Sequence, residues 1–125
     1  MHIDEAAASV AIARIERENE KRCADAGVVG VQARLQVAAL RAFYMAIVGE
    51  TNRGTLPSEL RRAAAAFTAN LLLSVVDTIT SGNQPQRFEE ARLVVAEVGF
   101  CIGEFINDPQ PGRVERVPAV PGGRA

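Results

Sequence analysis

The stretch that decides the fold is residues 88–106, FEEARLVVAEVGFCIGEFI. Its apolar residues recur at intervals of three and four, which places their side chains on one face of an α-helix. The preceding Asn83-Gln84-Pro85-Gln86 suits a helix start, because proline is tolerated in the first turn. The sequence therefore predicts a helix over 88–106. Its apolar positions are Phe88, Ala91, Val95, Val98, Ile102 and Phe105.

Three further helices are predicted upstream, over residues 4–26, over 28–48, and from Thr55 to Ser81-Gly82. Thr55 suits an N-cap, and glycine suits the position that ends a helix. The chain has no useful alternation of period two and no Asn-Gly or Asp-Gly turn, so no strand is predicted. We expect an all-α fold, a four-helix up-down bundle with short loops.

The first predicted helix has a narrow apolar stripe. Its second part, residues 16–22, is charged at six of seven positions, so we expect this end to be poorly buried. Such a helix could pack in its own chain, swing, be exchanged with a second copy, or leave a groove for another helix. The stripe comprises Ala8, Ile12, Ile15, Asn19, Cys23 and Ala26.

The C-terminal residues 107–125 differ in composition from the rest of the chain. They hold four prolines and three glycines in nineteen residues, which is typical of disorder. We therefore expect one domain, a helical bundle over 1–106, followed by a disordered tail over 107–125.

Composition and charge argue against several classes of function. Fourteen basic residues against fifteen acidic ones give a net charge of −1, which does not favour binding to nucleic acid or to an anionic membrane. The longest uncharged apolar-rich stretch, residues 63–76, is shorter than the ~18 residues that span a bilayer. No signal-peptide pattern is present. Thirteen arginines against one lysine, with abundant alanine and glycine, indicate a bacterial gene. We expect a cytoplasmic protein that binds neither nucleic acid nor membrane.

The residues that carry catalysis or metal binding are scarce. The single histidine, His2, leaves no histidine-based metal site, di-iron site or nucleophile–histidine pair. Residues 49–55 have the glycine spacing of a phosphate-binding loop but lack its lysine. Glu90, Glu97 and Glu104 recur every seven residues, as on a solvated helix flank. We predict no catalytic, cofactor-binding or metal-binding residue, and no enzymatic activity.

Four residues of the second predicted helix are candidates for contact with a protein partner. Arg34 and Arg41 lie seven residues apart on one face and complement the glutamates of the last helix, either within the bundle or across an interface. Tyr44, the only tyrosine, is either a core residue with its hydroxyl at the rim or an interface residue. Phe43 precedes it. The predicted partner-binding residues are Arg34, Arg41, Phe43 and Tyr44.

Three segments together resemble the FlaF family of flagellar-biosynthesis proteins: LRAFYMAI at 40–47, LPSELR at 56–61, and the helix that follows Pro85. The resemblance covers roughly residues 40–106. Phe43-Tyr44 stands where that family usually has an aliphatic residue and tryptophan. The resemblance implies a small helical cytoplasmic protein that binds flagellin and supports its synthesis or secretion, with no enzymatic residues and no cofactor.

These observations favour a non-enzymatic helical protein-interaction module, a flagellin-binding chaperone or regulator that shields an apolar segment of its client in a groove between helices. A second interpretation is a homodimeric structural or regulatory bundle, such as a phage or plasmid adaptor, with the first helix exchanged between chains. A third is a bundle that binds a small molecule among the alanines at 63–66, Gly99 and Gly103.

Overall fold

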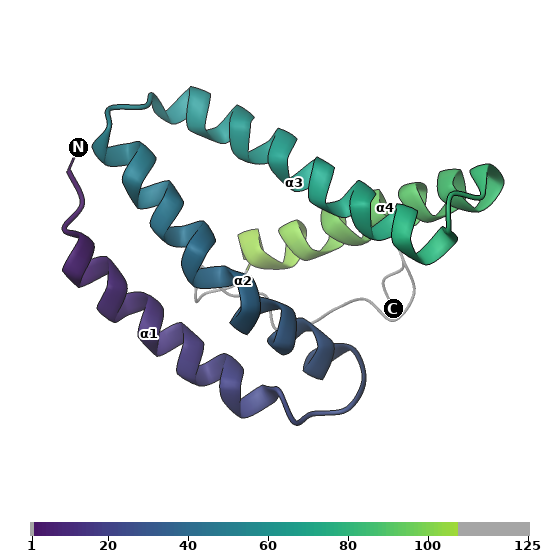
Figure 1. Ribbon diagram of the computed structural model, residues 1–125, viewed down its shortest axis with the longest axis horizontal. Coiled ribbons are helices and arrows are strands. Elements are labelled where there is room, and N and C mark those ends of the chain that lie inside the picture. Colours follow the sequence, from purple (N-terminus) through teal and green to yellow (C-terminus); the bar gives the residue numbers. More distant parts are fainter. Residues whose placement is uncertain (1, 108–125) are drawn as a thin grey trace. The chain divides into compact units, whose positions relative to one another are not determined.

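The structure is a computed structural model that describes residues 2–107. Four α-helices follow one another: α1 (Glu5–Arg22), α2 (Gly27–Asn52), α3 (Pro57–Thr80) and α4 (Gln84–Asn107) (Figure 1). The described residues contain no strand. The predicted all-α, four-helix fold is confirmed, whereas the up-down order of packing stays a prediction. Of the predicted tail, Asn107 is instead the last residue of α4, and residues 108–125 lie outside the described part of the chain.

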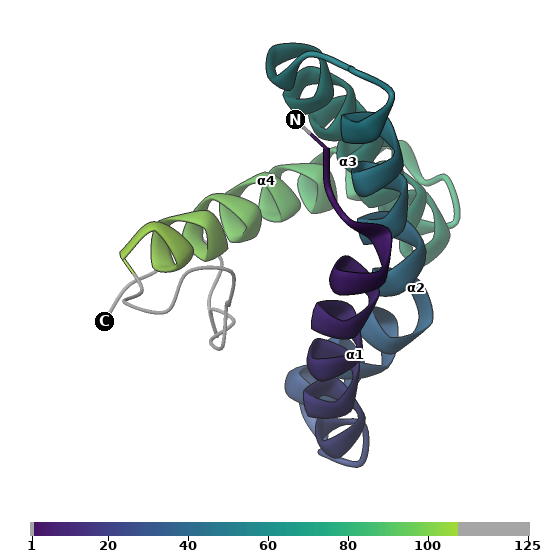
Figure 2. The same ribbon diagram turned by 90° about the vertical axis from the view of Figure 1, so that its left-hand side faces the viewer.

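The chain divides into two compact units, Met1–Ala65 and Ala66–Ala125, with the boundary inside α3. In the first unit α1 and α2 pack side by side and run antiparallel (Figures 1 and 2). The described part of the second unit holds the remainder of α3 and all of α4. An ion pair between Asp77 and Arg87 joins α3 to α4 within this unit.

The ends of α1 and α2 differ from the predicted ones. Asp4 caps α1, since its carboxylate accepts a hydrogen bond from the Ala6 amide at 3.2 Å. The helix ends at Arg22, earlier than predicted, because the chain turns at Cys23 and Asp25. Conversely, α2 passes through Gly49, its predicted end, and stops after Asn52. The glycine with a positive φ that follows this helix is Gly54 (φ +90°), two residues beyond Asn52.

Different hydrogen bonds cap the N-termini of α3 and α4. Thr55 was predicted to cap α3, but the helix begins at Pro57, two residues later. At this start the Leu56 amide donates a hydrogen bond to the Glu59 carboxylate at 3.4 Å. In α4, Asn83 caps the helix by accepting a hydrogen bond from the Gln86 amide at 3.1 Å. The helix therefore begins at Gln84, before the predicted position.

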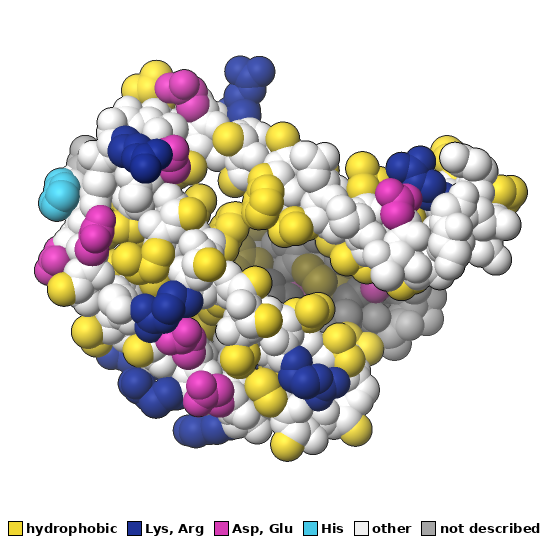
Figure 3. All heavy atoms as spheres, viewed as in Figure 1, with side chains coloured by type: hydrophobic (Ala, Val, Ile, Leu, Met, Phe, Trp, Pro, Cys, Tyr) yellow, Lys and Arg dark blue, Asp and Glu magenta, His cyan; other side chains and the backbone are white. Residues whose placement is uncertain are grey.

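Few apolar side chains are buried in the described residues. The buried ones are Ile12, Ala33, Val48 and Val76. Many large apolar side chains are exposed instead, and Figure 3 shows hydrophobic side chains reaching the surface in many places. Exposed apolar area of this extent on a helical protein marks surfaces that other elements or partners cover.

The length and apolar composition of α3 are relevant to the predicted cytoplasmic location of the protein. By length and composition α3 is the one helix among the described residues that could cross a membrane, although the uncharged stretch at 63–76 alone falls short of that length. Core helices of soluble proteins and signal sequences share this length and composition. The cytoplasmic location therefore stays a prediction.

Candidate functional site

Arg41 of α2 joins the two helices of the first unit at the middle of their contact. Its Nη2 lies 2.7 Å from Oε1 of Glu16, and its Nε lies 3.1 Å from each carboxylate oxygen. Its Nη1 donates to the Ser9 hydroxyl at 2.7 Å, and Nη2 also reaches the Ser9 carbonyl oxygen at 3.4 Å. One guanidinium thus contacts two residues of α1 that lie about two helical turns apart.

The contact between Glu16 and Arg41 shifts the pKa values of both side chains. Hydrogen bonding to Arg41 lowers the pKa of Glu16 below its ordinary value, with a further contribution from the nearby positive charge and an opposing one from desolvation. The same contact raises the pKa of Arg41. Bidentate pairing of this kind fixes the orientation of both side chains, because the planar guanidinium matches the carboxylate.

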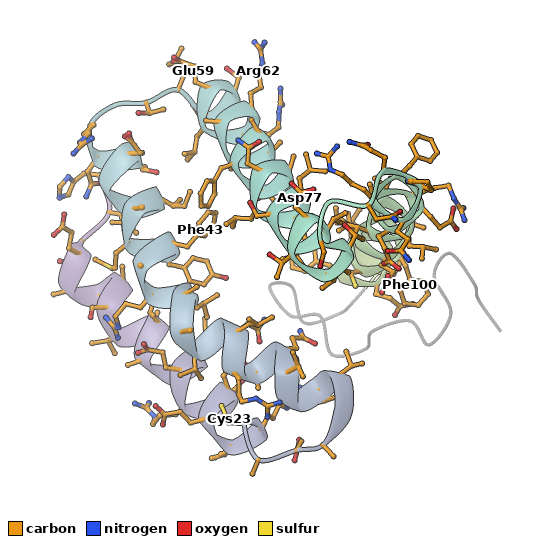
Figure 4. The ribbon with its side chains drawn as sticks, turned by 45° about the vertical axis from the view of Figure 1, so that its right-hand side comes forward. Cys23, Phe43, Glu59, Arg62, Asp77 and Phe100 are labelled. Carbon is orange, nitrogen blue, oxygen red and sulfur yellow. The ribbon has the colours of Figure 1, made fainter. Side chains whose placement is uncertain are left out.

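Arg34 occupies the closed end of the same hairpin. Its Nη1 donates to the carbonyl oxygen of Cys23, the C-cap of α1, at 2.7 Å; Figure 4 labels Cys23 beside the turn between the two helices. A positive group at a helix C-terminus satisfies a free carbonyl and favours the helix dipole. The turn also requires Gly30, because a Cβ there would lie 1.8 Å from the carbonyl oxygen of Asp25.

The open end of the hairpin is held by Asn52. Its Oδ1 accepts a hydrogen bond from the Ile3 amide at 2.6 Å, and its Nδ2 donates to the Ile3 carbonyl oxygen at 2.9 Å. The hairpin is therefore fastened by polar contacts at both ends and in the middle, with Ile12 and Ala33 buried along it.

The four predicted partner-binding residues do not form one surface. Arg34 and Arg41 share a face, as predicted, and that face contacts α1. The acidic partner of Arg41 in the structure is Glu16 and not a glutamate of α4. Sequence reasoning missed Ser9 and Glu16, which are seven residues apart, as Arg34 and Arg41 are; that matched spacing was the available signal.

Phe43 and Tyr44 project in different directions. Consecutive residues of a helix point about 100° apart. Figure 4 shows Phe43 on the side of α2 away from α1. Each of the two residues is 36% exposed. Whether either contacts a partner stays a prediction.

The side of α2 opposite α1 forms an uncharged, mainly apolar surface that also holds Gln32, and we call it the outer face of α2. Its large members Val28, Val31 and Leu35 are 59%, 49% and 67% exposed. The charged residues of α2 are Arg34, Arg41 and Glu50, and both arginines turn to α1. The outer face therefore carries no charge over about four helical turns. It comprises Val28, Val31, Leu35, Ala38, Ala42 and Phe43.

Helix α4 carries a second exposed apolar surface and has no fully buried residue. Several side chains predicted to face a core are instead exposed, among them Phe88 at 76% and Val95 at 72%, whereas Ala91 and Val98 are half-buried. Gly99 lies on this surface, and a Cβ there would meet no atom within 4 Å. We call these residues the α4 stripe: Phe88, Val95, Gly99, Ile102 and Ile106.

The glutamates of α4 lie on the side away from the α4 stripe. Glu90, Glu97 and Glu104 are half-buried, where a solvated flank was predicted. Cys101 is also half-buried. Burial raises the pKa of its thiol, and the negative charges of Glu97 and Glu104 add to that effect.

Among residues 2–107, no group of three or more His, Cys, Asp or Glu side chains is arranged to hold a metal ion. Comparison of the chain with protein families, with curated proteins and with solved structures gives no match.

Proposed function

We propose that the chain is a non-enzymatic helical protein-interaction module that binds an apolar helix of a protein partner on the outer face of α2. The observation that carries this proposal is the exposure of Val28, Val31 and Leu35 on a face without charge. Apolar residues at intervals of three and four are the anchors by which helices dock on one another.

The hairpin supports this role by holding α2 in place. Arg41 and Arg34 join α2 to α1 through hydrogen bonds, so that the outer face is presented on a fixed helix. A preorganised surface binds with a smaller loss of conformational entropy. Full burial of one aliphatic side chain contributes roughly 1.5–3 kcal/mol, so a few anchors suffice for binding.

The resemblance of residues 40–106 to the FlaF family supports flagellin as the partner. In this proposal the protein is a cytoplasmic chaperone or regulator that shields an apolar helical segment of flagellin before its export. The outer face suits such a client, because an uncharged face imposes no desolvation cost on charged groups when an apolar helix covers it.

The proposal is tested by titrating the full chain with purified monomeric flagellin and measuring the heat of binding. We expect saturable binding, and we expect Val31→Glu to weaken it at least about tenfold, because the carboxylate would be buried without a partner. Val10→Glu is the matched control, since Val10 is an exposed valine of α1.

Two results contradict the proposal in different ways. Absence of binding by the folded wild-type chain rules out flagellin as the partner. Equal binding by Val31→Glu and Val10→Glu, with helix content preserved in both, rules out the outer face of α2 as the binding surface.

A further inference from the structure

We propose that two copies of this chain associate through α4, with the two helices antiparallel and the α4 stripe of each covering that of the other. The inference is independent of the function proposed for α2, and it differs from an exchange of α1 between chains. It rests on the exposure, area, symmetry and charge of the stripe.

The α4 stripe has the spacing of a helix–helix interface. Its residues follow one another at intervals of seven, four, three and four, and it extends over about 27 Å of helix. Ile102 is 53% exposed, Val95 and Ile106 are each 72% exposed, and Phe88 is 76% exposed. The stripe therefore forms a single exposed line along almost the whole helix.

The exposed area is about what a dimer needs. A fully exposed aromatic side chain presents about 150–250 Å². The stripe then presents on the order of 500 Å², and a two-fold pairing would bury on the order of 1,000 Å² in total. That area lies just below the roughly 1,200–2,000 Å² of stable specific interfaces and in the range of weak ones, so we expect a weak, reversible dimer.

The stripe is self-complementary about Glu97, which lies at its midpoint. In an antiparallel pair with its two-fold axis there, Phe88 faces Ile106 of the second copy and Val95 faces Gly99. Ile102 faces Arg92, whose aliphatic part can cover it while the guanidinium stays in solvent. The open space above Gly99 receives the branched valine, so bulky and small positions alternate across the contact. Such a contact is isologous, which is the commonest symmetry of homodimers.

The charges of α4 favour the antiparallel pair. Arg92 borders the stripe, and it forms an ion pair with Glu89 of its own helix, so its charge is compensated before association. The glutamates at 90, 97 and 104 lie on the other side of the helix, so those of the two copies do not meet. Antiparallel helices also place opposite ends of their dipoles together.

The first test is sedimentation equilibrium of the full chain over a range of concentrations. We expect a monomer–dimer equilibrium, with Val95→Glu weakening the dimer at least about tenfold. Gly99→Ala should also weaken the dimer, because its methyl group fills the space that Val95 of the second copy needs. This variant is the more specific test, since alanine stabilises the helix itself and a loss of dimer could not be due to a loss of helix. Gly49→Ala, a helical glycine of α2 that also has open space around it, should leave the dimer unchanged.

The second test determines which residues of the two α4 helices face each other. In a background of Cys23→Ala and Cys101→Ala, chains carrying Phe88→Cys are mixed with chains carrying Ile106→Cys and oxidised. The antiparallel pair predicts disulfides between the two kinds of chain. A preference for disulfides between identical chains contradicts the register, and a monomer at every concentration overturns the proposal. Val31→Glu should still dimerise, which separates this inference from the function proposed for α2.

Discussion

Arg41 of α2 binds Glu16 through both carboxylate oxygens while its Nη1 donates to the Ser9 hydroxyl 2.7 Å away. A single side chain thereby connects two turns of α1 to the middle of α2. The contact fixes the register of the hairpin, since a shift of α1 along α2 would break it.

Replacement of Arg41 by lysine should lower the melting temperature of the protein. Lysine keeps the positive charge but cannot bind Glu16 with two donors and Ser9 with a third. Arg41→Ala should lower the melting temperature further, and thermal unfolding followed by circular dichroism measures both. Arg53→Lys is the control, because Arg53 is highly exposed and forms only a 3.5 Å ion pair with Glu50. Equal effects at the two arginines would contradict the role given to Arg41.

The Glu16–Arg41 pair should make stability depend on pH. The pKa of Glu16 is lower in the folded chain than in the unfolded one, so its contribution is present above the unfolded pKa and is lost as pH falls through the folded pKa. Urea unfolding at pH 7 and pH 3 should show a smaller loss for Glu16→Gln than for the wild type. Some loss should remain, because Arg92 also lowers the pKa of Glu89.

Gly30→Ala should destabilise the hairpin despite the greater helix propensity of alanine. The added Cβ would lie 1.8 Å from the Asp25 carbonyl oxygen, a backbone atom that cannot rotate away. The cost should be about 1–3 kcal/mol, as for other overpacked sites. Gly49→Ala, where the Cβ meets no atom within 4 Å, should instead stabilise by about 0.5–1 kcal/mol. Urea unfolding distinguishes the two, and equal free energies of unfolding would contradict the close turn.

Ile12→Ala should destabilise the first unit by about 2–4 kcal/mol, because Ile12 is the buried side chain of α1 and its truncation leaves a cavity. Val10→Ala, two residues away on the exposed side, should change the free energy of unfolding by less than about 0.5 kcal/mol. Similar losses for both would mean that α1 does not pack as described.

The periodicity of the sequence predicted the helices but not all of their ends. Ile12 is buried at the centre of the stripe predicted for α1, because the spacing of apolar residues reports the buried face directly. The prediction that α2 ends at Gly49 was wrong, because glycine adopts helical dihedral angles as well as left-handed ones. The left-handed residue is Gly54, and the helix reaches Asn52.

The candidate site was predicted less completely than the fold. The spacing of Arg34 and Arg41 shows that they share a face, but it does not show which helix that face meets. Glu16, the partner of Arg41, was hidden in a run of alternating charges. Phe88 and Val95 have the spacing of core residues and yet are exposed. A helical period shows that residues share a face, but it does not show what covers that face.

The most direct test of the account is the mapping of methyl chemical shifts of the full chain as purified flagellin is added. The account predicts that the largest changes fall on Val28, Val31 and Leu35 of the outer face of α2, while Val10 of α1 remains unchanged. Changes confined to other methyl groups, or no changes at saturating flagellin, would contradict the claim that this face is the binding surface.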